Sequence, residues 1–240
     1  MNILCIGNSF SVDATRYLHN IARADGKEIN ITDLYIGGCS LERHYRNMLS
    51  GNREYTLDIN GNLTAFKVSL SEALLNQSWD YVTVQQVSSC APYYETYQPY
   101  LNAICEYVRK CAPKAKLLVH QTWAYEEGSK RLNEELGYKH QEDMFADVEA
   151  SYIKAADEIN AEFIIPSGAA FQELIKAGIA PVHRDTFHAS LGIGRYTLGL
   201  TWYRALTGAD VTENTFSDFD EEISAETVKK IKECVMNVKM

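Results

Sequence analysis

The segment MNILCIGNSFSVDATRYLHNIA, residues 1–22, places a strand-like run directly before a glycine-containing turn and a helix-like run. Asn2 to Ile6 is apolar and has the length of a buried strand. From Val12 to Ala24, apolar residues recur at helical spacing. The sequence GNSFS, residues 7–11, is therefore predicted to be the turn that joins the two elements. In open α/β sheets, ligands bind at such turns, beyond the carboxyl ends of the strands.

The same alternation of strand and helix patterns continues along the whole chain. Strands are predicted at Asn2–Ile6, Ile31–Ile36, Tyr81–Gln86, Lys116–Gln121 and Glu162–Ile165. Helices are predicted at Val12–Ala24, Leu41–Leu49, Leu70–Leu75, Tyr97–Lys110, Glu142–Ile159, Gly168–Ala177, Leu191–Leu206 and Ala225–Met236. Such alternation favours right-handed crossovers and a parallel sheet covered on both faces. We therefore predict one α/β domain over residues 1–240, a three-layer αβα sandwich with a central parallel sheet of about five strands.

One segment, REYTLDINGNLTAFKVSL at residues 53–70, departs from this alternation. Two runs of alternating residues flank Asn60-Gly61, a dipeptide that supplies the positive φ angles of a type I′ turn. The pattern predicts an antiparallel β-hairpin, inserted between the second and third sheet strands, where it could overhang the site.

Composition excludes several classes of partner. The net charge of −9 and the lack of clustered Lys and Arg argue against binding to nucleic acid. No apolar run approaches the length of a membrane span, and no signal-peptide pattern precedes Gly7, so a cytoplasmic protein is predicted. The six cysteines show no CxxC spacing and are expected to be reduced. The sequence predicts no oligomeric state, because the sandwich accounts for every apolar helix face.

Chemically useful residues follow the predicted strands. They are Ser9 after the first, Gly37-Gly38 after the second, Gln85-Gln86 at the third, Trp123 and Tyr125 after the fourth, and Asp185 and His188 after the fifth. A parallel sheet brings the carboxyl ends of its strands to one edge, so these residues can share one site.

Three of these residues, Ser9, His188 and Asp185, match the requirements of nucleophilic catalysis. A serine hydroxyl becomes a nucleophile when an imidazole accepts its proton, and a carboxylate fixes the tautomer of that imidazole. The oxyanion formed on attack needs donors, for which we expect the backbone N–H groups of Ser9 and Gly38 and a glutamine side chain.

The sequence resembles the SGNH (GDSL-like) hydrolase superfamily, in particular a GNSFS-type subgroup similar to carbohydrate acetylesterases. The resemblance rests on GNSFS, IGGCS, DYVTVQQVS and DTFHAS followed by LGIGRY, and it spans most of the chain. It implies a flavodoxin-like sandwich and a Ser-His-Asp ester hydrolase that needs no metal or other cofactor. The expected substrates are small esters or carbohydrates with acetyl or other short acyl groups. Asn8, Trp123, Tyr125 and His183 are the expected substrate contacts, with core packing as the alternative for Trp123 and Tyr125.

The third block departs from the superfamily pattern, which has an asparagine in a GxND-like stretch. Here the side-chain donor would have to be Gln85 or Gln86. Because successive strand residues point to opposite faces, only one of them can face the site. Gln86 is favoured because it lies nearer the end of the strand.

Several alternatives stay open. His183, Asp185 and His188 could hold zinc in a metal-dependent hydrolase. The glycine-containing turns could bind phosphate, although the GxGxxG and GxxxxGK[ST] motifs are absent. The tyrosine-rich segment APYYETYQPY, residues 91–100, could serve a non-catalytic carbohydrate-binding protein. Ser9 or Ser11 could simply be a helix N-cap, and Asp185 could cap the helix that follows it.

Overall fold

The computed structural model describes residues 1–240, and its seven strands form one sheet in the order β4-β3-β2-β1-β5-β6-β7. The strands are β1 (Asn2–Ile6), β2 (Asn30–Tyr35), β3 (Tyr55–Ile59), β4 (Asn62–Val68), β5 (Tyr81–Val84), β6 (Lys116–Gln121) and β7 (Ile164–Pro166). Strand β1 pairs in parallel with β2 on one side and with β5 on the other. The chain therefore changes direction across the sheet at β1, and such a switch point is where open α/β sheets bind ligands.

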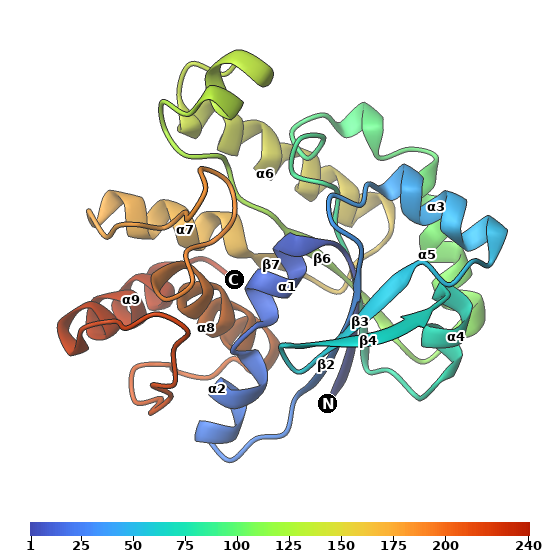
Figure 1. Cartoon of the computed structure of the whole chain (residues 1–240), viewed down its shortest axis with the longest axis horizontal. Coiled ribbons are helices and arrows are strands. Elements are labelled where there is room, and N and C mark those ends of the chain that lie inside the picture. The colour runs from blue at the N-terminus through green and yellow to red at the C-terminus, as the bar shows by residue number, and fades with distance from the viewer.

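Helices cover both faces of the sheet, which confirms the predicted three-layer α/β sandwich. They are α1 (Ser9–Thr15), α2 (Leu18–Ala24), α3 (Leu41–Ser50), α4 (Leu70–Leu75), α5 (Tyr100–Cys111), α6 (Gln141–Glu158), α7 (Ser167–Lys176), α8 (Ile193–Thr207) and α9 (Ala225–Asn237). Helices α1, α2, α7, α8 and α9 lie on one side of the sheet, and α3, α4, α5 and α6 on the other (Figure 1). No helix combines the length and the apolar composition that crossing a membrane requires.

The predicted hairpin is present as β3 and β4, but it lies in the sheet. Strand β3 pairs antiparallel with β2, and β4 with β3, so the hairpin extends the edge of the parallel sheet. Asn60 and Gly61 have φ angles of 53° and 77°, as a type I′ turn requires. The Asn60 side chain also accepts the Ile31 N–H at 2.8 Å, which fixes the turn against β2. The predicted overhang of the site is therefore wrong.

The first predicted helix is divided in two and starts earlier than expected. Helix α1 begins at Ser9, because Asn8 adopts an extended conformation and its side chain accepts the Phe10 N–H at 3.0 Å. The helix N-cap is thus Asn8, and not Ser9 or Ser11 as the alternative reading proposed. A break after Thr15 separates α1 from α2.

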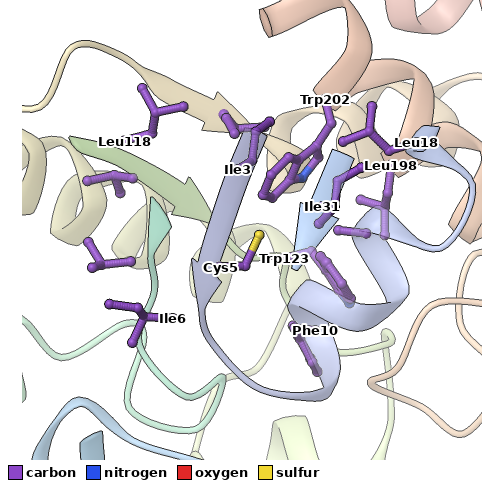
Figure 2. Close-up of a cluster of buried hydrophobic side chains, with 14 of the residues drawn as sticks. Ile3, Cys5, Ile6, Phe10, Leu18, Ile31, Leu118, Trp123, Leu198 and Trp202 are labelled. Carbon is purple, nitrogen blue, oxygen red and sulfur yellow. The ribbon is translucent and has the colours of Figure 1, made fainter. Parts of the chain in front are cut away.

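The central strand β1 is buried on both faces, as the interior strands of parallel sheets are. Side chains alternate along it, so Ile3 and Cys5 face Trp202 and Trp123, whereas Ile6 points to the opposite side (Figure 2). All six cysteines are free thiols. The strand that leads to Ser9 is therefore held between both apolar layers of the core.

Two carboxyl groups, Asp33 and Asp58, are buried side by side in the sheet. Asp33 on β2 is paired in register with Asp58 on β3 and with Cys5 on β1. Thr15 donates a hydrogen bond to Asp33 Oδ2 at 2.8 Å, but the Oδ1 atoms of both aspartates have no partner. Burial, followed by the neighbouring charge of Asp58, raises the pKa of Asp33 to about 7. Asp33 is therefore largely protonated in the folded protein below that pH.

This raised pKa predicts that the protein loses stability as the pH rises from about 4 to about 7. In the unfolded chain Asp33 ionises near its ordinary pKa of 3.8, whereas in the folded protein it ionises near 7. Between these values the unfolded state binds fewer protons, so Asp33 lowers the free energy of unfolding by up to about 1.4 kcal/mol per pH unit. In Asp33→Asn, which cannot ionise, thermal unfolding should depend less steeply on pH over this range. The exposed Asp218→Asn should behave as wild type, and equal slopes in Asp33→Asn and wild type would contradict the prediction.

Candidate active site

Ser9 stands at the first position of α1, directly beyond the end of the central strand. The turn before it is tight, because a Cβ added to Gly7 would lie 2.5 Å from Ser11 Oγ and 3.1 Å from Gln85 Cδ. The backbone N–H of Ser9 makes no hydrogen bond within the protein, as is typical of the first turn of a helix. Ser9 thus presents both a hydroxyl and a free backbone donor at the edge of the sheet.

The structure brings Ser9, His188 and Asp185 into one hydrogen-bonded line, although Ser9 and His188 are 179 residues apart. His188 Nε2 lies 2.8 Å from Ser9 Oγ. His188 Nδ1 lies 2.8 Å from Asp185 Oδ2. The order hydroxyl, imidazole, carboxylate allows a proton to pass from the hydroxyl to the imidazole while the carboxylate stabilises the resulting positive charge.

Asp185 holds the backbone of His188 as well as its ring. Asp185 Oδ1 accepts the His188 N–H at 2.9 Å across a turn in which Thr186 has a φ of 74°. A positive φ is costly for a β-branched residue. Partial burial acts to raise the pKa of Asp185, but the ring and backbone hydrogen bonds from His188 outweigh it and hold that pKa below its usual value. Helix α8 begins only at Ile193, so Asp185 caps this turn and not the helix.

A buried ionic cluster fastens the His188 loop to the helix that begins at Ser9. Asp13 in α1 is 1% exposed and accepts hydrogen bonds from Arg184 at 2.9 and 3.0 Å and from Arg195 at 2.9 Å. Arg184 in turn donates its backbone N–H to His188 O at 3.0 Å. The charge of Asp13 is compensated by two guanidinium groups, and this pairing makes its burial tolerable.

Gly38 supplies a second free backbone donor beside Ser9. Its φ of +62° is a conformation that favours glycine, and its N–H has no partner within the protein. Asn8 connects the two donor-bearing turns, because its Nδ2 donates to Cys39 O at 3.1 Å while its Oδ1 accepts the Phe10 N–H. Asn8 lines the cavity at Ser9, as a predicted substrate contact should, but it is 1% exposed and its amide is occupied in holding these turns together.

Neither glutamine takes the oxyanion role that the sequence suggested. Strand β5 ends at Val84, and the side chains of Gln85 and Gln86 turn into the protein, where they are 2% and 1% exposed. Gln86 accepts the Leu41 N–H at 2.9 Å and donates twice to Thr96. Gln85 and Gln86 do not line the cavity at Ser9. The expectation for both residues is corrected, because their amides are satisfied by the scaffold.

Gln85 belongs instead to a chain of buried polar side chains that sequence reasoning missed. Gln85 Nε2 donates to Asn8 Oδ1 at 2.8 Å, and its Oε1 lies 2.7 Å from His120 Nδ1. His120 Nε2 is 3.0 Å from Ser167 Oγ. Burial lowers the pKa of His120 to about 3, so its ring is neutral and donates from Nδ1. This chain of side chains runs from α7 across β6 and β5 to the N-cap of α1.

A cavity of about 400 Å³ opens in front of Ser9, His188 and Gly38. Several of its lining residues had no predicted role, namely Phe10, Tyr35, Val87, Ser88, Ser89, Arg131 and Phe187. Tyr125 also lines it but is 2% exposed, and its hydroxyl is 3.0 Å from Ser88 Oγ. The N–H groups of Ser88 and Ser89 make no hydrogen bond within the protein. These two serines directly follow the glutamine pair, and that position was the one sequence signal that could have identified them.

Trp123 and His183 lie behind the site and do not line it. Trp123 is fully buried, stacks on Phe10 with ring centroids 4.1 Å apart, and donates to Phe187 O at 2.8 Å (Figure 2). His183 is buried, with its Nε2 3.0 Å from Ala124 O, and burial lowers its pKa to about 4. The substrate contact expected of His183 is therefore corrected to a packing role, and for Trp123 the core-packing alternative holds. Their polar groups are already bonded to backbone carbonyls.

The geometry does not support the zinc alternative. His183, Asp185 and His188 do not converge, and no three His, Cys, Asp or Glu side chains gather into a potential metal site. Both ring nitrogens of His188 are occupied, by Ser9 and by Asp185. The HxDxxH string thus divides into a buried scaffold histidine and an acid–imidazole pair.

Comparison with known proteins gives the following similarities. The model of a family described as "Domain of unknown function (DUF4886)" matches residues 2–236. A DUF4886 family protein from Bacteroides uniformis is 35% identical, with a TM-score of 0.89 over 99% of this chain and 93% of that chain. A protein from Slackia heliotrinireducens, provisionally assigned as an SGNH hydrolase, is 25% identical, with a TM-score of 0.61 over 86% and 98%. No curated protein matches the sequence.

An acetylxylan esterase from Geobacillus stearothermophilus is 16% identical, with a TM-score of 0.55 over 86% of this chain and 94% of that chain. At this identity the likeness concerns the fold alone. The chain therefore has an SGNH-like α/β fold with a mixed seven-stranded sheet, as the sequence resemblance implied.

The buried chain of side chains predicts that Gln85→Leu lowers kcat more than it changes KM for a substrate of this site. The substitution removes the hydrogen bonds that the Gln85 amide makes to Asn8 Oδ1 and to His120 Nδ1. Asn8 holds both turns that carry free N–H donors, so those turns should be placed less precisely. Loss of a buried hydrogen-bond partner costs about 1–3 kcal/mol, so thermal stability should fall too. The exposed Gln77→Leu is the control. Steady-state kinetics on folded protein measure the effect, and an unchanged kcat would refute this positioning role.

Proposed function

The chain belongs to the DUF4886 family, and we propose that it is a serine ester hydrolase that removes acetyl or other short acyl groups from carbohydrates or small esters. The observation that carries this proposal is the line from Ser9 Oγ through His188 to Asp185, with both contacts at 2.8 Å. This geometry allows His188 to accept the proton that a nucleophilic Ser9 must lose. Ser9 and Gly38, whose backbone N–H groups are free, line the same cavity and could stabilise an oxyanion there.

The proposed reaction proceeds in two proton-balanced halves. In the first, Ser9 Oγ attacks the ester carbonyl while His188 Nε2 accepts its proton, and the N–H groups of Ser9 and Gly38 donate to the oxyanion. The C–O bond to the alcohol then breaks, and His188 returns the proton to the leaving oxygen. In the second half, water attacks the acyl-enzyme, His188 takes and returns one proton, and the acid is released. The free N–H groups of Ser88 and Ser89 are the further donors available where the superfamily pattern has an asparagine.

The cavity favours a small polar substrate. Its volume of about 400 Å³ is near the lower end of the range for small-molecule pockets. Tyr35, Ser88 and Ser89 are among its lining residues, and hydroxyl groups such as theirs can hydrogen-bond to sugar hydroxyls. The fold shared with an acetylxylan esterase agrees with this substrate class.

A binding-only function has less support. Its motivating segment, residues 91–100, packs against the protein, with Tyr97 buried and donating to Ala91 O at 2.8 Å. Tyr94 stacks on Tyr97 with ring centroids 5.4 Å apart. The segment therefore does not offer an open row of aromatic rings to a sugar, and a binding module would have no use for the Ser9–His188–Asp185 line.

The first test combines Ser9→Ala, His188→Ala and the double variant with p-nitrophenyl acetate. Each single change should reduce turnover by about a thousandfold or more, and the double variant should be no slower than the worse single, because nucleophile and base act as one unit. A fluorophosphonate probe should label wild type and leave Ser9→Ala unlabelled. Ser217→Ala, at an exposed serine, is the control. Near wild-type turnover in folded Ser9→Ala would remove Ser9 as the nucleophile.

The second test is Asp185→Asn. The asparagine oxygen can still accept the His188 N–H, but its NH₂ group cannot accept the ring Nδ1–H, so the imidazole is left in the wrong tautomer. We expect turnover to fall by about ten- to a thousandfold, with stability little changed. Measurement with p-nitrophenyl acetate across pH 6 to 9 covers the assay range. Activity within about twofold of wild type would leave a Ser9–His188 dyad as the catalytic unit.

A further inference from the structure

Arg131 is the only cationic side chain that lines the cavity. It stands at the start of a single π-helical turn, Arg131–Glu135. Its guanidinium donates no hydrogen bond within the protein. The nearest carboxylate, Glu135, is 4.0 Å away and more than half exposed, so this contact is weak. Arg131 thus presents a charged group with free donors to the cavity.

The position of this guanidinium is fixed by an aromatic ring. Arg131 Cζ lies 4.0 Å from the centroid of the Phe187 ring, a cation–π contact. The same ring also contacts the imidazole of His188, with centroids 4.0 Å apart. One aromatic ring therefore contacts both the guanidinium and the base that serves Ser9. A substrate group bound by Arg131 would belong to the same small molecule as the ester.

The two arginines that fasten the His188 loop do not share this availability. Arg184 and Arg195 are both bonded to buried Asp13, and Arg195 also pairs with Asp220. Their guanidinium groups fasten the His188 loop and are occupied. Arg131 has no comparable pair with a buried carboxylate, so its guanidinium N–H donors are free to bind a ligand.

We propose that Arg131 binds a carboxylate of the substrate, and that the natural substrates are O-acylated acidic sugars of the uronic acid type. This inference rests on the proposed function and specifies its substrate class. The planar guanidinium offers two parallel N–H donors that match the two oxygens of a carboxylate. Tyr35 and Ser89, which line the cavity, carry hydroxyl groups that can serve the rest of the sugar, and the volume of about 400 Å³ suits a single sugar unit.

The experiment compares two substrates that differ only in charge. One is a mono-O-acetylated methyl glucuronoside, and the other is its carboxyl methyl ester, which is neutral. Release of acetate gives kcat/KM for each. Wild type should prefer the acid by about 10- to 100-fold, the range expected for a charge-assisted bidentate contact. Arg131→Gln should reduce this preference to about one, chiefly through KM of the acid, and Arg131→Lys should keep part of it.

Lys130→Gln is the matched control, because Lys130 is the adjacent exposed cation and does not line the cavity. It should keep the wild-type preference, whereas a general field effect would weaken the preference in both variants and overturn the proposal. An equal loss on both substrates in Arg131→Gln, or no acid preference in wild type, would also overturn it.

Failure of the proposed function would look different from failure of this inference. If wild type hydrolyses the neutral ester without preferring the acid, only the Arg131 inference fails. If wild type hydrolyses neither ester, the proposed function fails. Calorimetric titration of Ser9→Ala with methyl glucuronoside then decides the Arg131 site separately, with binding that disappears in Ser9→Ala/Arg131→Gln supporting it and no binding refuting it.

Discussion

The buried amide of Asn8 is the interaction on which the geometry of the site depends. It accepts hydrogen bonds from Phe10 N–H and from Gln85, and it donates to Cys39 O. These bonds begin the helix at Ser9, fix the neighbouring Gly38 turn and connect both to the strand beside β1. Because the amide is almost completely buried, each lost bond would leave an unpaired polar group in a dry environment. The two free N–H donors therefore occupy fixed positions before any ligand arrives.

A second connection, an ion pair, places the loop that carries the His188 imidazole next to the helix that begins at Ser9. Asp13 lies in the helix that begins at Ser9, and Arg184 lies in the loop that ends at His188, so their ion pair joins the two halves of the site. The carboxylate of Asp185 then holds both the backbone and the ring of His188. A strained residue, Thr186, is tolerated in that turn because hydrogen bonds on both sides determine its conformation. The protein thus uses paired charges to place a loop that has little secondary structure of its own.

Aromatic packing also supports the loop that carries His188. Trp123 stacks on Phe10, next to Ser9, and donates to the carbonyl of Phe187, next to His188. Phe187 in turn contacts both the imidazole of His188 and the guanidinium of Arg131. Large, rigid and close-packed rings hold their neighbours in place, because displacing one ring would leave a void on one side and cause a steric clash on the other. The nucleophile, the base and the cation that we assign to substrate binding are therefore held by one connected layer of side chains.

The sequence by itself determined the order of the elements, the parallel sheet, the hairpin turn and the three residues of the Ser-His-Asp line. Periodicity and turn chemistry are local properties, and a parallel sheet collects the ends of its strands at one edge whatever the loops contain. The tertiary structure alone decided which polar groups remain free. Gln85 and Gln86 are occupied by His120, Asn8, Leu41 and Thr96, and Trp123 by Phe187, all through bonds to residues distant in the chain. Arg131, unlike Arg184, has no buried carboxylate within reach, and no sequence pattern encodes that difference.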